Sequence, residues 1–139
     1  LCAGSGTLLT TVLDVKKAGS KTFVVLDTGI HHLGGMSGLG RIPRSAITLL
    51  NLTAQREGEM VADVVGPLCS PLDSLARGQK MPPVEVGDVL AVPNVGAYGL
   101  TASLLGFLSH ATPVEAAYRG SEVIETWSFQ CWHNPNRAV

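Results

Sequence analysis

The sequence predicts an all-β domain, an antiparallel β-barrel or sandwich with one or two short helical turns. Three observations predict this fold class. Apolar and β-branched runs recur at intervals of about ten residues, turn residues separate them, and helical periodicity is scarce. A chain of 139 residues is also long enough to bury one core, so we expect a single domain spanning residues 1–139.

The elements follow from these runs in order. The predicted strands are Thr7–Val15, Thr22–Leu26, Ala46–Thr53, Glu59–Val65, Val89–Val92, Val114–Tyr118 and Glu122–Trp127. Turn-prone Lys16–Ser20 joins the first two strands as a hairpin, and Arg119–Ser121 joins the last two. This spacing is typical of a barrel or sandwich of about seven or eight strands.

Helical signals are confined to two places. Pro71–Ala76 could form one helical turn, with Ser70 as its N-cap, and Tyr98–Leu108 could begin a short helix. Gly29–Gly40 is the one long irregular element, and we expect the loop Gly29–Arg44 to be the most mobile segment because glycine lowers the barrier to disorder.

The predicted core takes one apolar face from each strand. It should include Leu13, Val15, Val24, Leu26, Ile47, Leu49, Val64, Val89 and Val92.

Composition excludes several classes of function. The formal net charge is −1 and the chain has no basic run, which argues against a nucleic-acid partner. No apolar run has the length of a membrane span, so we expect no membrane partner. Three scattered cysteines form no disulfide framework and no Cys-x-x-Cys pair, which favours a reducing, cytoplasmic location.

Two segments resemble ligand sites only weakly. His31 and His32 are adjacent and have no partner at ligand spacing, so a structural or surface role is favoured and we predict no metal. The glycines of Gly34–Gly40 lack the Gly-Lys-Ser/Thr of a phosphate loop, which favours a flexible loop over a phosphate cradle.

Residues 66–73 and 96–99 are the remaining candidates. Cys69 follows a strand, where a thiol can be exposed and reactive, although the residues alone favour a small buried core position. Asp73 would flank the same turn, where most carboxylates are solvated. Tyr98 follows Gly96 near a possible helix start, where it could hold an anion or simply pack.

Together these segments carry a resemblance to a known family. Gly66-Pro67-x-Cys69-x-x-x-Asp73, then Val86–Val92, then Gly96-Ala97-Tyr98-Gly99 resembles the C-terminal β-domain of the fold-type III pyridoxal-phosphate decarboxylases. Ornithine, diaminopimelate and arginine decarboxylases belong to that family, and their β-domain is like that of alanine racemase. Pro113–Glu115 is similar to the family's Arg-Pro-x-Glu-Val end.

The resemblance implies a decarboxylase, a lyase of amino-acid metabolism with pyridoxal 5′-phosphate as cofactor. In such enzymes an N-terminal TIM barrel carries the Schiff-base lysine and binds most of the cofactor. We expect that barrel to be absent from this chain and the chain alone to be inactive.

The resemblance also implies roles for individual residues. Cys69 matches the cysteine that enters the partner's active site in a homodimer, where a thiol can protonate the substrate. Tyr98 matches the tyrosine that reaches the cofactor phosphate. Ser70 and Asp73 match positions that contribute to binding the amino-acid substrate across the interface.

Two departures bear on the substrate. Ser70 stands where ornithine- and diaminopimelate-type enzymes usually have Asp or Glu, which reads a distal amine, and Ser109–Thr112 replaces the usual arginine. Leu26–His32 and Gly66–Asp73 look closer to antibiotic-pathway members, some of which act on an amino acid carried on an acyl carrier protein.

Two other interpretations stay open. The chain could be a free-standing β-domain that serves as a dimerisation or carrier-protein-docking module. The other is a member of the related alanine-racemase architecture. That family would supply a catalytic tyrosine from this domain instead of a cysteine, so Gly66-Pro67-x-Cys69 argues against it.

Overall fold

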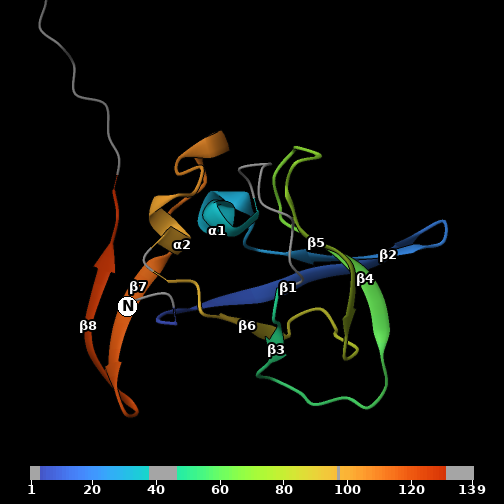
Figure 1. Ribbon diagram of the computed structural model, residues 1–139, viewed down its shortest axis with the longest axis horizontal. Coiled ribbons are helices and arrows are strands. Elements are labelled where there is room, and N and C mark those ends of the chain that lie inside the picture. Colours follow the sequence, from blue (N-terminus) through green and yellow to red (C-terminus); the bar gives the residue numbers. More distant parts are fainter. Residues whose placement is uncertain (1–3, 38–46, 97, 131–139) are drawn as a thin grey trace, which may run out of the picture. The chain divides into compact units, whose positions relative to one another are not determined.

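The computed structural model describes residues 4–37, 47–96 and 98–130. The chain divides into two compact units, Leu1–Leu105 and Gly106–Val139 (Figure 1).

A six-stranded sheet forms the first unit. In sequence order its strands are β1 (Thr7–Ala18), β2 (Lys21–Leu26), β3 (Leu50–Asn51), β4 (Met60–Val65), β5 (Ser74–Met81) and β6 (Val89–Pro93). Their order across the sheet is β3-β6-β1-β2-β4-β5. The long strand β1 joins the two halves, because its first part pairs with β6 and its second part pairs with β2. The mostly-β prediction is confirmed.

The sheet is mixed, which corrects the expectation of a purely antiparallel barrel or sandwich. Strands β2 and β4 run parallel, with Val24 opposite Val64. A parallel pair needs a long crossover between its strands, usually one that contains a helix. Here the chain between them holds helix α1 (Ile30–Ser37) and strand β3.

Helix α1 occupies part of the segment Gly29–Gly40, where the sequence predicts an irregular loop. That prediction is wrong for Ile30–Ser37, because tertiary contacts offset the low helix propensity of Gly34 and Gly35. The helix is kinked at Leu33. The Gly34 N–H donates to Ser103 Oγ (2.8 Å), and a Cβ atom at Gly34 would lie 3.0 Å from the Ser103 Cα, so glycine permits this close approach. Residues 38–46, which include the rest of the expected loop, lie outside the described residues.

The core lies along both halves of the sheet. Val24, Leu26, Ile47, Val64 and Val92 are buried as predicted, while Val15, Leu49 and Val89 are only partly buried. Leu13 is 49% exposed, which corrects its place in the predicted core. A bulge between Val12 and Asp14 adds one residue to β1, so that Val12 is buried and Leu13 faces solvent.

Residues 71–81 also differ from the prediction. No helix forms at Pro71–Ala76, because the chain enters β5 at Ser74 and pairs there with Val65 of β4. The helical turn expected to begin at Tyr98 is present as α2 (Tyr98–Thr101). No described helix has the length and apolar character that crossing a membrane requires.

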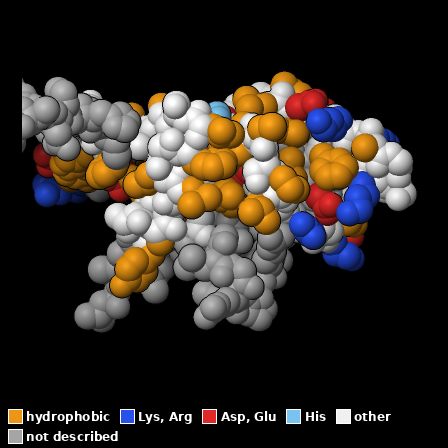
Figure 2. Space-filling model, turned by 90° about the horizontal axis from the view of Figure 1, so that it is seen from above, with side chains coloured by type: hydrophobic (Ala, Val, Ile, Leu, Met, Phe, Trp, Pro, Cys, Tyr) orange, Lys and Arg blue, Asp and Glu red, His pale blue; other side chains and the backbone are white. Residues whose placement is uncertain are grey.

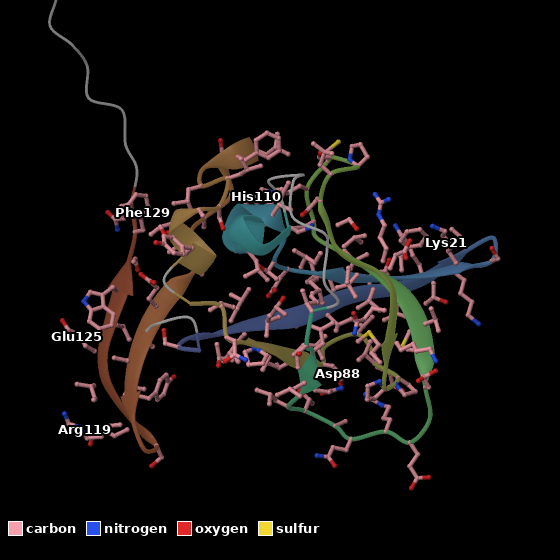
Figure 3. The ribbon with its side chains drawn as sticks, viewed as in Figure 1. Lys21, Asp88, His110, Arg119, Glu125 and Phe129 are labelled. Carbon is pink, nitrogen blue, oxygen red and sulfur yellow. The ribbon has the colours of Figure 1, made fainter. Side chains whose placement is uncertain are left out.

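The second unit contains a short 3-10 turn, η1 (Phe107–Ser109), and a β-hairpin. Its strands β7 (Val114–Arg119) and β8 (Glu122–Ser128) pair antiparallel, and Gly120 takes a positive φ of 63° in the turn, as the predicted closing hairpin requires. Arg119 and Glu125 are labelled on this hairpin in Figure 3. The tail from residue 131 lies outside the described residues.

Candidate functional site

Cys69 lies on the loop of residues 66–73, which connects β4 to β5. The thiol is free and exposed, so the preference of the residues alone for a buried core position is wrong. Short backbone bonds shape the loop: the Ser70 N–H donates to the Leu68 carbonyl (2.8 Å), and the Asp73 N–H donates to the Ser70 carbonyl (3.1 Å). The loop therefore presents the thiol outward from a compact turn.

Ser70 is half-buried beside Cys69. Its Oγ accepts a hydrogen bond from the Leu72 N–H (3.2 Å), a local bond that is typical of serine in turns. This resembles the N-cap role that the sequence predicts, although the chain continues into a strand. The hydroxyl keeps its own proton to donate.

Asp73 closes the loop from inside the unit, where it is 3% exposed. Its Oδ1 accepts a hydrogen bond from the Ile30 N–H at the start of α1, and its Oδ2 accepts one from the Leu68 N–H, both at 2.8 Å. The expectation that this carboxylate is solvated is therefore wrong. Asp73 instead joins the Cys69 loop to helix α1.

Tyr98 begins α2 and is 76% exposed. The short helix is held against α1, because Ser103 Oγ donates to the Gly99 carbonyl (2.5 Å) and accepts from the Gly34 N–H. Figure 1 shows α1 between α2 and the loop that joins β4 to β5. The structure thus links Cys69 and Tyr98 through one helix, while Ala97 lies outside the described residues.

An open groove of about 510 Å³ runs beside the loop. Ser70 and the turn before β5 line one part of it, and the cations Lys16, Lys21 and Arg77 line another. The Gly78 N–H donates to Asp63, and Lys21 is paired with the same carboxylate at 3.1 Å. The bond from Gly78, followed by that from Lys21, lowers the pKa of Asp63. Figure 2 shows charged side chains gathered at the right, over the β1–β2 end of the unit, and hydrophobic ones across the middle.

Sequence reasoning did not single out these three cations. They come from β1, β2 and β5, so no local motif joins them, and β5 itself was not predicted. The described residues contain no group of three or more His, Cys, Asp or Glu that could hold a metal ion.

Comparison with known proteins places this geometry in context. The family model described as "Pyridoxal-dependent decarboxylase, C-terminal sheet domain" matches residues 2–96. An L-glutamyl-[BtrI acyl-carrier protein] decarboxylase of Niallia circulans is 37% identical over 124 residues, which cover 86% of this chain and 29% of that protein. A diaminopimelate decarboxylase of Archaeoglobus fulgidus is 41% identical over 100 residues, which cover 72% of this chain and 23% of that protein.

A solved structure agrees with these matches. The diaminopimelate decarboxylase of Helicobacter pylori, in complex with L-lysine, has a TM-score of 0.74 and 31% identity, covering 88% of this chain and 29% of that one. The chain therefore spans less than a third of the length of the relatives it matches.

Proposed function

Because the chain belongs to the family of pyridoxal-dependent decarboxylase C-terminal sheet domains, we propose that it is the C-terminal domain of an amino-acid decarboxylase. The observation that carries the proposal is the exposed Cys69 thiol on a loop fixed from within by Asp73. A barrel elsewhere in the protein would supply the Schiff-base lysine. The proposal includes a cytoplasmic homodimer in which Cys69 reaches the partner's site.

The exposed side chains fit a cofactor that binds outside the unit. Tyr98 is 76% exposed, so its phenolic O–H can donate to a phosphate oxygen there. Gly96, with a φ of 63°, turns the chain just before α2. Tyr98 would therefore help to hold the phosphate of pyridoxal 5′-phosphate.

In the reaction, Cys69 would be the acid. Bound pyridoxal phosphate would supply the electron sink for the pair that remains on the α-carbon when the substrate's carboxylate leaves as carbon dioxide. The Cys69 S–H then gives its proton to the α-carbon, a C–H bond forms, and the thiolate recovers a proton from solvent. An exposed thiol on a fixed loop suits this step, because a general acid must reach the reacting atom.

Ser70 and the groove bear on the substrate. A neutral hydroxyl gives a distal ammonium a weaker hydrogen bond than a carboxylate would, about 1 kcal/mol against 1.5–3. Lys21 is paired with Asp63, which also lines the groove, but Lys16 and Arg77 add positive charge there and would attract a negatively charged carrier. We therefore favour an amino acid linked to a carrier protein, as in the name of the Niallia circulans relative, over a free diamino acid.

The same groove favours a second candidate function. A domain with this cationic surface could serve as a docking or dimerisation module that takes no part in the chemistry. In that case Cys69 would be dispensable for decarboxylation.

The test replaces Cys69 in the full-length decarboxylase that carries this chain. Diaminopimelate, ornithine and a glutamyl-carrier protein are offered as substrates, and carbon dioxide release is measured. We expect Cys69→Ala to lower kcat about 10²- to 10⁴-fold, the usual contribution of a general acid. Leu72→Ala is the matched control, since Leu72 lies on the same loop and is also exposed.

Each candidate function predicts a different result. Undiminished turnover in Cys69→Ala would contradict the acid role and favour the docking module. Turnover of the glutamyl-carrier protein in preference to the free amino acids would support the carrier-linked substrate.

A further inference from the structure

The Asp73 carboxylate joins two backbone segments that lie far apart in the sequence. Ile30, which donates to Oδ1, opens helix α1, and Leu68, which donates to Oδ2, directly precedes Cys69. Asp73 also holds the loop through its own carbonyl, which accepts a hydrogen bond from the Gly66 N–H (3.1 Å). Asp73 thus holds the backbone that precedes the thiol, at Gly66 and Leu68, and the start of α1.

Two glycines make room for this carboxylate. A Cβ atom built on Gly29 would lie 2.8 Å from Asp73 Cγ, and one built on Gly66 would lie 2.6 Å from the same atom. Carbon atoms that are not bonded do not approach so closely, and the packed interior leaves little room to shift. The Asp73 carboxylate therefore depends on both glycines, and we call the set Gly29, Gly66 and Asp73 the carboxylate clamp.

We propose that Asp73 is a positioning residue, which acts on the reaction through the Cys69 loop and not by touching substrate. The inference rests on the proposed function of Cys69. Its physical basis is that the carboxylate offers an acceptor oxygen to each of two buried N–H groups, so loop and helix keep one relative position. Placing an acid correctly matters because small displacements of a catalytic group cost much of the rate.

Asp73→Asn is the sharpest variant, because it keeps the shape of the side chain. The amide has one oxygen, so its NH₂ group must face one of the two N–H donors and that bond is lost. Gly29→Ala is the second variant, which crowds the carboxylate without changing its charge. Asp88→Asn is the matched control, since Asp88 is equally buried and holds a different part of the unit.

The first readout is amide hydrogen exchange in this 139-residue chain. In Asp73→Asn, we expect the Ile30 and Leu68 amides to exchange about tenfold faster or more, relative to the β4 amides of the same sample. Asp88→Asn should leave that ratio unchanged, even though it lowers overall stability. If the Ile30 and Leu68 amides of Asp73→Asn exchanged as slowly as in the wild type, the proposal that Asp73 holds the loop would be wrong.

The second readout is turnover by the full-length decarboxylase, with the substrate that the wild-type enzyme converts. Asp73→Asn should lower kcat about 10- to 100-fold while KM changes less than about threefold, because loop position and not substrate binding is altered. Added to Cys69→Ala, the same change should cost less than about twofold, because the group it positions is gone.

The outcomes separate the two hypotheses. Full, multiplicative losses in the double variant, or a raised KM with normal kcat, would overturn the positioning role and indicate direct substrate contact or general destabilisation. Normal turnover in Cys69→Ala would overturn the proposed function of the thiol, and with it the proposal that Asp73 acts on the reaction. Whether Asp73 holds the loop is decided separately, by the exchange rates of the Ile30 and Leu68 amides relative to the β4 amides.

Discussion

Three groups converge on the carboxylate of Asp88, which lies just before β6. Arg56 donates from its guanidinium, Asn51 from its side-chain amide (2.8 Å) and Glu85 from its backbone N–H (2.9 Å). The bond from Arg56 is the largest cause, followed by that from Glu85, and together they lower the pKa of Asp88 to about 2. Figure 3 places Asp88 beside β3 and Lys21 at the β1–β2 turn.

This network predicts a stability change that depends on pH. A carboxyl whose pKa is lower in the folded state stabilises the fold above its ordinary value of 3.8 and loses that contribution as the pH falls toward 2. Asp88→Asn should therefore lower the free energy of unfolding by about 2 kcal/mol at pH 6, and this deficit should shrink between pH 4 and 2. Urea unfolding of both proteins across this range measures it.

Glu59→Gln provides the comparison for that experiment. Glu59 and Lys80 form an exposed ion pair, so its loss should change stability by less than about 0.5 kcal/mol at any pH. A deficit of Asp88→Asn that stays constant down to pH 2 would contradict the role of the charged network.

Single residues also show where sequence reasoning reaches its limit. The motif Gly66-Pro67-x-Cys69-x-x-x-Asp73 helps to indicate the family, together with Val86–Val92 and Gly96–Gly99, because its spacing lies within one short loop. It cannot tell that Asp73 is buried, since the partner N–H of Ile30 is 43 residues away in sequence. The exposure of Cys69 has the same cause, because it depends on how the loop is held.

At the scale of elements, the bulge in β1 decides which side chains reach the core. Strand residues alternate between two faces, so counting back from Val15 places Leu13 inward. The extra residue between Val12 and Asp14 shifts this alternation by one, and Val12 takes the buried position. Nothing in the apolar and β-branched residues of Leu8–Leu13 marks the bulge, so the pattern alone could not reveal it.

Truncating these neighbours tests the bulge. Val12→Ala removes two buried methyl groups and should destabilise the fold by about 2 kcal/mol. Leu13→Ala removes an exposed side chain and should change the free energy of unfolding by less than about 0.5 kcal/mol. Equal losses for the two variants in thermal or urea unfolding would contradict the register described here.

Helix α1 and the parallel pair β2–β4 are one feature that sequence analysis missed. The glycines and adjacent histidines of Gly29–Gly40 favour a loop. A loop over Gly29–Arg44 followed by a strand at Ala46–Thr53 gave no reason to expect a parallel pair of β2 with β4. The helix forms because Asp73 and Ser103, both distant in sequence, accept its N–H groups. Helix propensity depends on the local sequence alone, so it cannot predict partners that are distant in sequence.

At the scale of the whole molecule, seven of the eight strands in the described residues and most of the core were predicted, because strand runs and turns carry strong local signals; β5 was missed. The assignment to the decarboxylase family rests on loops and turns at fixed spacing, and the family match bears it out. The dimer, the catalytic role of Cys69 and the roles of Ser70 and Tyr98 stay predictions, since they concern groups outside this chain.

A titration with pyridoxal phosphate tests how the whole chain depends on the rest of the protein. The four lysines lie on β1, β2 and β5, and none is on α2 with Tyr98, so we expect this chain alone to leave the cofactor's visible absorbance unchanged. Joined to the remainder of the decarboxylase, it should bind stoichiometrically, and Tyr98→Phe should weaken binding about tenfold through loss of one charged hydrogen bond. Stoichiometric binding by the isolated chain would contradict the proposal that the Schiff-base lysine lies in the rest of the protein.

The crossover between β2 and β4 has a consequence for how the chain assembles. Strands β1 and β2 close over a short turn, as do β4 and β5, but the bond from Ile30 to Asp73 closes a loop of more than 40 residues. Closing such a loop costs entropy before its contacts repay it, so we expect both hairpins to form before they dock. The turn that bears Cys69 therefore exists early as part of a hairpin, and acquires its fixed orientation only when the last long-range contact closes.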